Sequence, residues 1–278
     1  MRLPLLAALA LSVLAASGCA QTAPVADADA VPADTMATPP RIGPVFAGPM
    51  QADPVYDAAT LLEAMHARHA ATWYRTLSFT QATSRRLPDG TVSVETWREW
   101  AALPGRLRIE MDDPMAGVDV LFVGDTTYVY RDGALALTEV DRNPLLLWGF
   151  DVYAQDPAES LRILAQEGAD LDAFRTDIFE NRPMYVLGTP ESGEVWIEQD
   201  RLLFVRRVET DDDGATQDIR FADYEPLGGG WIAPLVEVYA DGERVFWEEY
   251  SDMVADPDLD PVLFDPARWA DGVAAGVE

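Results

Sequence analysis

The stretch EVWIEQDRLLFVRRVETDDDGATQDIRFADYEPLGGGWIAPLVEVYADGERVFWEEYSDMV, residues 194–254, decides the fold. It is dense in Val, Ile, Phe, Trp and Tyr, and it is interrupted by Asp-Gly at 213–214 and 241–242 and by three glycines at 228–230. β-branched and aromatic runs separated by Asp-Gly are the sequence signal of β-hairpins. We therefore expect consecutive antiparallel strands, and a sheet this wide must bury one of its faces.

The same pattern continues towards the N-terminus. Leu107, Ile109 and Met111 alternate with charged residues, which is the period of a strand that has one buried face. Two more Asp-Gly pairs lie at 89–90 and 132–133. Four such turns in one domain indicate a long antiparallel meander, because parallel βαβ units would need a helix between successive strands.

Helices are expected at the start and in the middle of this pattern. Apolar residues at helical spacing predict a helix over 58–69. Asn143-Pro144 and Asp156-Pro157 are helix starts, since each places an N-cap residue before a proline, and Gly168 is positioned to end the second of these helices. The sequence therefore predicts an α+β fold with the helices on one face of a large antiparallel sheet.

The N-terminal segment predicts export and lipidation. Arg2 and the apolar residues 3–16 form a short signal-peptide core, and the small residues before Cys19 match a lipoprotein cleavage site. We expect a signal peptide over 1–18, a lipidated Cys19, and an Ala- and Pro-rich tether over 19–53. A secretory signal with an incidental Cys is the alternative.

The remainder of the chain is expected to form one folded domain over 54–270, with a flexible tail over 271–278. Ala20 is not the Asp that commonly retains lipoproteins at the inner membrane, so the predicted location is the outer membrane, facing the periplasm. The anchor at Cys19 would be the contact with the membrane.

The charge of the chain excludes several partners. The formal net charge is −28, and all 20 basic residues are Arg. Binding to nucleic acid needs a basic patch, so we predict no nucleic-acid partner. An anionic membrane surface would repel the folded domain. Such an acidic composition is more typical of a proteome-wide bias than of a specific function, and it supports solubility.

Few residues offer chemistry. The two histidines, His66 and His69, lie three apart on the first predicted helix, where Glu63 is the only nearby third metal ligand, so packing at a helix–sheet contact is the simpler interpretation. Asp256 begins an Asp-x-Asp-x-Asp run that lacks the Gly and Glu of a calcium loop. With Cys19 lipidated, no thiol is left. We predict no catalytic residue, no metal and no cofactor, and a hydrolase that acts through carboxylates is the alternative.

Four segments in order resemble the LolA/LolB-like family of bacterial lipoprotein carriers and lipoprotein-sorting proteins. They are Ser78-Phe79-Thr80-Gln81, Trp100 followed after three residues by Pro104, GDTTYVY at 124–130, and LDPVLF at 259–264. The resemblance spans most of residues 56–269. It departs from the soluble carrier at Leu103, where that carrier has an Arg thought to help hold its lid.

The resemblance implies an open half β-barrel whose concave, apolar face is covered by helices and holds acyl chains. The residues expected to line or cover this cavity are Leu107, Ile109, Met111, Phe122, Trp148, Phe150, Leu161 and Leu164. The implied partners are lipid acyl chains or acylated lipoproteins. Two alternatives stay open: the same side chains fill an ordinary core, or the domain is an envelope interaction or stress-sensing module that carries no ligand.

Overall fold

The computed structural model describes residues 54–111, 117–211 and 213–275. The chain divides into two compact units, 1–52 and 53–278, and the architecture below belongs to the second. The predicted signal peptide, Cys19 and the tether lie outside the described residues. Among the residues that are described, no helix combines the length and the apolar character needed to cross a membrane.

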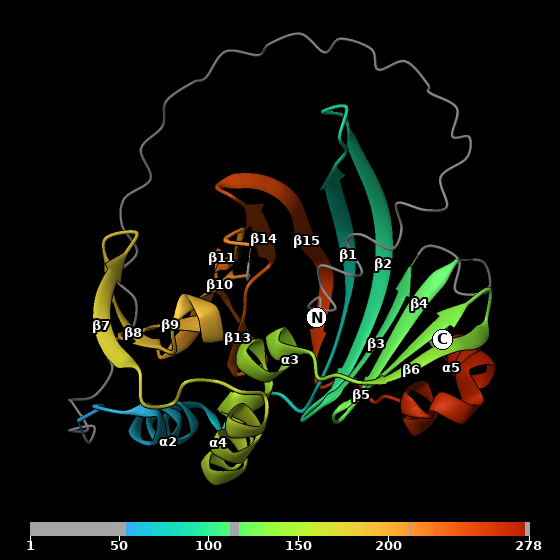
Figure 1. Cartoon of the computed structure of the whole chain (residues 1–278). Helices are drawn as coiled ribbons and strands as arrows, with labels where there is room; N and C mark the ends of the chain where they lie inside the picture. Colours follow the sequence, from blue (N-terminus) through green and yellow to red (C-terminus); the bar gives the residue numbers. More distant parts are fainter. Residues whose placement is uncertain (1–53, 112–116, 212, 276–278) are drawn as a thin grey trace, which may run out of the picture. The chain divides into compact units, whose positions relative to one another are not determined.

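Within the described residues, thirteen strands form one antiparallel sheet, and β12 (Glu225–Leu227) and β13 (Gly230–Ile232) form a separate hairpin. In order across the sheet, the strands are β6 (Ala134–Val140), β5 (Thr126–Arg131), β4 (Val118–Val123), β3 (Arg106–Met111), β2 (Val92–Ala102), β1 (Thr76–Arg86), β15 (Glu243–Ala255), β14 (Leu235–Ala240), β11 (Thr216–Ala222), β10 (Leu203–Thr210), β9 (Glu194–Glu198), β8 (Arg182–Leu187) and β7 (Phe174–Phe179). The sheet is strongly curved and is not closed into a barrel, so β6 and β7 are its edges (Figure 1). The predicted open antiparallel sheet is confirmed.

The four predicted Asp-Gly turns all connect neighbouring strands. At 132–133 the two φ angles are 52° and 73°, and at 241–242 they are 49° and 84°, which is the positive-φ pair that a tight hairpin requires. Glu180 and Asn181 make the same turn between β7 and β8, with φ of 50° and 61°. That turn carries no Asp-Gly signal.

The glycines at 228–230 turn the chain between β12 and β13. A Cβ at Gly229 would lie 2.7 Å from the carbonyl oxygen of Thr72, so only glycine allows this approach of two backbones.

The three predicted helical starts are confirmed. Helix α2 (Ala58–His69) begins at a capping box formed by Asp57 and Thr60. Helices α3 (Pro144–Gly149) and α4 (Pro157–Gln166) begin at Asn143 and Asp156, and the 3-10 helix η2 (Asp151–Tyr153) joins them. The sheet curves around α3, and α2 and α4 pack against each other (Figure 1). These helices cover part of the concave face.

A second group of helical segments covers the convex face instead. It consists of η4 (Pro261–Phe264), η5 (Pro266–Arg268) and α5 (Trp269–Ala275), whereas η3 (Pro190–Ser192) lies in the β8–β9 connection. Leu263, Phe264 and Trp269 pack on Trp100, Leu121 and Tyr130. The expectation that helices lie on one face was therefore incomplete, because large apolar side chains on the second face also need cover. The predicted domain end at residue 270 falls inside α5.

Candidate ligand-binding face

The strand residues that were expected to line a cavity lie together on the concave face. Residues directly opposite each other in a ladder project to the same face, and Leu107 is opposite Phe122 while Met111 is opposite Trp97. The exposed fractions are 8% for Leu107, Ile109 and Met111, and 4% for Phe122. In this conformation these side chains are covered, so a ligand reaches them only after neighbouring groups move.

Aromatic rings continue this face across the centre of the sheet. Phe79 on β1 and Tyr250 on β15 have ring centroids 4.3 Å apart. Trp97 on β2 and Phe246 on β15 approach to 6.3 Å. The ladder registers place all four side chains on the same face as Met111. Aromatic rings and the aliphatic stripe on β3 and β4 together make a broad apolar surface.

Polar side chains interrupt this surface. Gln81 and Thr83 on β1 are buried, and the Gln81 amide donates to Thr83 Oγ1 at 2.7 Å. Glu99 on β2 is 5% exposed, and Glu248 on β15 is half-buried. The Tyr250 hydroxyl donates to Glu248 Oε2 at 2.9 Å. The apolar face therefore carries two carboxyl groups close to its centre.

Burial shifts both of these carboxyl groups towards the neutral form. It raises the pKa of Glu99 well above the usual range, and the charge of Glu248 raises it further. Burial also raises the pKa of Glu248 to about 7, although the hydrogen bond from Tyr250 opposes the shift. We did not anticipate this pair from the sequence. The sequence signal is that both residues stand at apolar positions of an alternating strand. Glu99 lies between Trp97 and Ala101 on β2, and Glu248 lies between Phe246 and Tyr250 on β15.

The predicted helical covering residues lie on a different part of the concave face. Trp148 is buried on α3, with its ring centroid 6.4 Å from that of Phe204 on β10, and Leu164 is buried on α4. Phe150 and Leu161 are half-buried. Helix α3 thus packs near β10 and β11, whereas the predicted strand lining is on β3 and β4.

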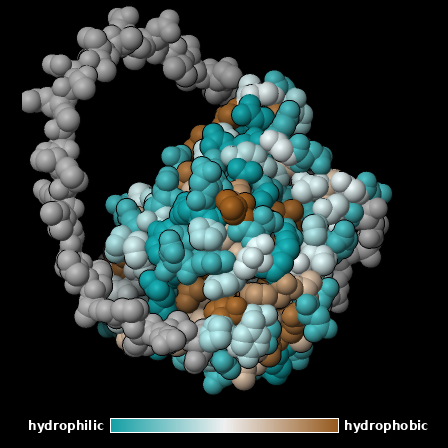
Figure 2. All heavy atoms as spheres, turned by 90° about the vertical axis from the view of Figure 1, so that its left-hand side faces the viewer, coloured by the Kyte–Doolittle hydropathy of each residue, from teal (hydrophilic) through white to brown (hydrophobic). Residues whose placement is uncertain are grey.

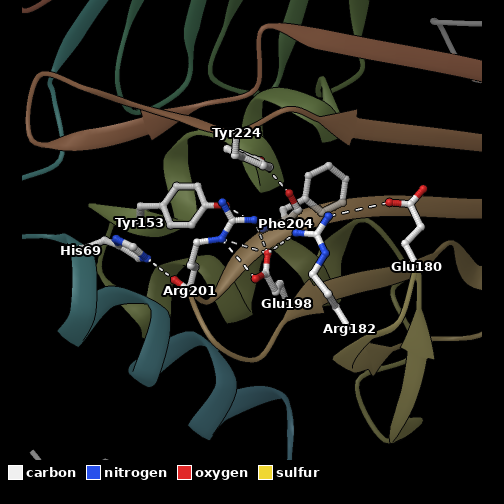
Figure 3. Close-up of polar contacts among 8 residues, drawn as sticks. All are labelled: His69, Tyr153, Glu180, Arg182, Glu198, Arg201, Phe204 and Tyr224. Atoms are coloured by element: carbon white, nitrogen blue, oxygen red, sulfur yellow. Dashed lines mark hydrogen bonds and ion pairs between the residues drawn. The ribbon is translucent and has the colours of Figure 1, made fainter. Parts of the chain in front are cut away.

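Specific hydrogen bonds hold the helices to the sheet (Figure 3). The Tyr153 hydroxyl accepts from the backbone N–H of Phe204 at 2.8 Å, and the Tyr224 hydroxyl donates to the carbonyl of the same residue at 2.6 Å. His69 Nε2 lies 2.8 Å from the carbonyl oxygen of Arg201, and burial lowers the pKa of this histidine. His69 therefore has the packing role at a helix–sheet contact.

Asp151 makes a further link between helices and sheet. Both of its carboxylate oxygens accept from the backbone N–H of Gly105, at 3.0 and 3.1 Å, so η2 is tied to the turn after β2. The side chain is 2% exposed, and burial raises its pKa to about 7. The sequence signal for this residue is a lone Asp directly after the apolar run 145–150.

A cleft of about 340 Å³ lies near the other end of the sheet. Met184, Val205 and Tyr224 are among its lining residues, together with Arg182, Arg201 and Arg220. All three arginines already pair with carboxylates: Arg182 lies 3.1 Å from Glu198, Arg201 also binds Glu198, and Arg220 lies 2.7 Å from Asp218. The positive charges of the cleft are therefore matched within the protein. Seen from the β7 side, the surface is mostly hydrophilic, with small hydrophobic groups (Figure 2).

Comparison with known proteins bears on the fold. No family model and no curated protein matches the sequence. Among solved structures, a domain named for outer-membrane lipoprotein sorting from Vibrio parahaemolyticus superposes with a TM-score of 0.53 at 15% identity, covering 76% of this chain and 97% of that chain. A LolA superfamily protein from Nitrosomonas europaea gives 0.50 at 15% identity, covering 76% and 98%. The fold is LolA-like.

A third structure with this LolA-like fold, a DUF1329 family protein from Desulfovibrio piger, gives a TM-score of 0.51 at 16% identity and covers 75% of this chain and 95% of that chain. The match thus extends over almost the whole length of each of these structures. At these identities the similarity concerns the fold, and the resemblance inferred from the four sequence segments is confirmed at that level.

Proposed function

We propose that this protein is a lipid-anchored protein of the cell envelope that binds a lipid or an acylated lipoprotein on the concave face, in lipoprotein or lipid trafficking. The observation that carries the proposal is the joined aliphatic and aromatic surface on this face, partly covered by helices. Burial of an acyl chain gains about 0.8 kcal/mol per methylene, so such a surface suits it. The proposal assigns no catalytic step and no cofactor to the chain.

Ligand entry in this proposal requires movement, because Leu107, Ile109 and Met111 are each only 8% exposed. The segment α3–η2–α4 packs near β10 and β11 and is held by Asp151, Tyr153 and the buried Trp148, so the movement in this proposal belongs to the side chains that cover β3 and β4. The lipid-modified Cys19 and the outer-membrane location belong to the same proposal and rest on the sequence of residues 1–20.

The test is native mass spectrometry with lipid extraction, on a chain that begins at residue 19 and carries Cys19→Ser, which allows purification without detergent. We expect bound lipid or acylated peptide at near-unit stoichiometry. Met111→Asp should abolish it, because a carboxylate on this face opposes an apolar chain. Leu137→Asp, on an exposed position of β6, is the matched control and should retain the ligand.

Since Met111→Asp could unfold the domain, Ile109→Phe is the second variant, and thermal unfolding is followed for each protein. Ile109→Phe fills space on the same face without adding charge, and it should reduce bound lipid. A chain that stays free of ligand after incubation with lipids and lipopeptides would contradict the proposal and favour an interaction module.

A further inference from the structure

Gln81, Glu99, Glu248 and Tyr250 on the concave face differ from the buried ion pairs on the convex face. On the opposite face, buried carboxylates pair with arginine: Glu110 lies 2.8 Å from Arg108, and Asp218 lies 2.7 Å from Arg206. Glu99 has no such partner. It is 5% exposed, and among the described residues it makes no hydrogen bond and no ion pair.

Burying a carboxyl group without a hydrogen-bond partner costs folding free energy, so the burial of Glu99 needs an explanation. Glu99 lies opposite Phe79 on β1 and opposite Ile109 on β3, which places its carboxyl group among apolar side chains on the concave face. Phe79, which is opposite Glu99, has its ring 4.3 Å from that of Tyr250, and Tyr250 is hydrogen-bonded to Glu248. The charge of Glu248 acts on Glu99, and that of Glu99 acts on Tyr250, so Glu99 faces the hydrogen-bonded pair of Tyr250 and Glu248. Glu99, Glu248 and Tyr250 therefore form one acidic, hydrogen-bonding patch, and among the described residues neither carboxyl group forms an ion pair.

The side chains around this patch indicate which kind of cation it would bind. The rings of Phe79 on β1 and Tyr250 on β15 lie beside the patch. Trp97 is two residues from Glu99 on β2, and Phe246 is two residues from Glu248 on β15. Aromatic faces attract ammonium groups, and the attraction grows when water is excluded. The adjoining Ile109 and Met111 offer an apolar path for a chain attached to the ammonium group.

We propose that Glu99 and Glu248 form a subsite for the cationic amine of an amphiphilic ligand, whose apolar chain lies along β3 and β4. This inference rests on the proposed function and specifies the ligand class. A cationic amine would stabilise the ionised form of these two carboxyl groups, whereas an anionic head group would oppose it. Glu95, opposite Thr83, adds a further carboxylate, and the basic Arg85 lies beyond Thr83 on β1, with its guanidinium 5.8 Å from the Phe246 ring centroid.

The test compares three ligands with the same ten-carbon chain: decylamine, decanol and decanoate. Binding to the Cys19→Ser protein is measured by calorimetry at neutral pH and below micelle formation, with salt added to screen the overall negative charge. We expect decylamine to bind at least tenfold more tightly than decanol, and decanoate to bind most weakly.

The variant Glu99→Gln/Glu248→Gln should lower the affinity for decylamine to that for decanol, while the affinity for decanol stays unchanged. The matched control is Glu243→Gln/Glu249→Gln, which removes the same charge from exposed positions of β15 and should keep the preference. Glu99→Gln alone, with the smaller structural change, should lose at least half of the preference on a logarithmic scale.

Retention of the amine preference in Glu99→Gln/Glu248→Gln would overturn the subsite, and so would equal binding of decanoate. In both cases binding of decanol would leave the proposed function standing. Absence of binding for all three ligands would contradict the proposed function together with the subsite.

Discussion

At the scale of single residues, Arg108 connects β3 to the C-terminal helical segments. Its side chain is 0% exposed, its Nε donates to Glu110 at 2.8 Å, and its guanidinium lies 3.6 Å from the Trp269 ring centroid. It also donates to the carbonyls of Leu263 and Trp269 at 3.1 and 3.2 Å. One side chain thus fastens the C-terminal segment to the convex face.

Arg108→Met should therefore destabilise the protein by about 3 kcal/mol, because it leaves the buried Glu110 carboxylate with a single partner. Urea unfolding measures the loss. The control is Arg98→Met, which removes the other partner of Glu110 from a side chain that is 36% exposed and should cost at most about 1 kcal/mol. An equal effect of the two variants would contradict this assignment.

The sequence predicts the buried face of a strand where apolar and charged residues alternate. The alternation of Leu107, Ile109 and Met111 fixed their common face, and this holds in the structure. Glu99, Glu248 and Asp151 were missed because a carboxyl group in an apolar period looks like an irregularity of the pattern, and its burial depends on strands distant in sequence.

At the scale of elements, β6 is an unprotected edge. All seven of its residues are exposed, including Leu135 at 53%, Leu137 at 44% and Val140 at 79%. Edge strands with apolar side chains and free backbone groups promote association between chains. Pairing with β5 fills only one side of this strand.

Leu135→Lys/Leu137→Lys should slow aggregation at high protein concentration without lowering stability, because charges on an edge disfavour pairing between chains. Light scattering over time measures aggregation, and a urea titration measures stability. Glu139→Lys on the same strand is the control for the change in charge. If the double variant aggregates as fast as the parent protein, β6 is not the route of association.

Element prediction succeeded where local chemistry decides the structure. Asp-Gly turns and the N-caps Asn143 and Asp156 act within a few residues, so the sequence reveals them. The convex cover formed by α5 was missed because it depends on Trp100, Leu121 and Tyr130, which lie far away in sequence. The curvature of the sheet was predicted only from the resemblance of the four segments to the LolA/LolB-like family, because the alternation of residues alone does not determine it.

At the scale of the whole molecule, stability should fall as pH rises from about 5 to 8. The folded state raises the pKa of Asp151 and of Glu248 to about 7, and burial raises that of Glu99 well above its usual range. A carboxyl group whose pKa is raised on folding stabilises the protein at low pH, and this contribution is lost as pH climbs from its unfolded value towards its folded value.

Each group whose pKa lies at about 7 should lose about 2 to 3 kcal/mol of stabilisation between pH 5 and pH 8, and urea unfolding at these two pH values measures the sum. Asp151→Asn/Glu99→Gln/Glu248→Gln should flatten the dependence, since amides do not ionise. Glu249→Gln, on an exposed site of β15, should leave it unchanged. A triple variant that keeps the full pH dependence would assign it to the general negative charge of the chain instead.

The position of β15 between β14 and β1 has a consequence for how the molecule assembles. Its residues 243–255 are among the last of the folded domain, yet they join the first strand to the rest of the sheet at its centre. Contacts so distant in sequence form slowly. A chain that emerges from its N-terminus cannot complete its sheet until nearly all of it is available. The sheet is therefore completed late, and truncation before residue 243 should leave two separate sheet fragments, one of β1–β6 and one of β7–β11 with β14.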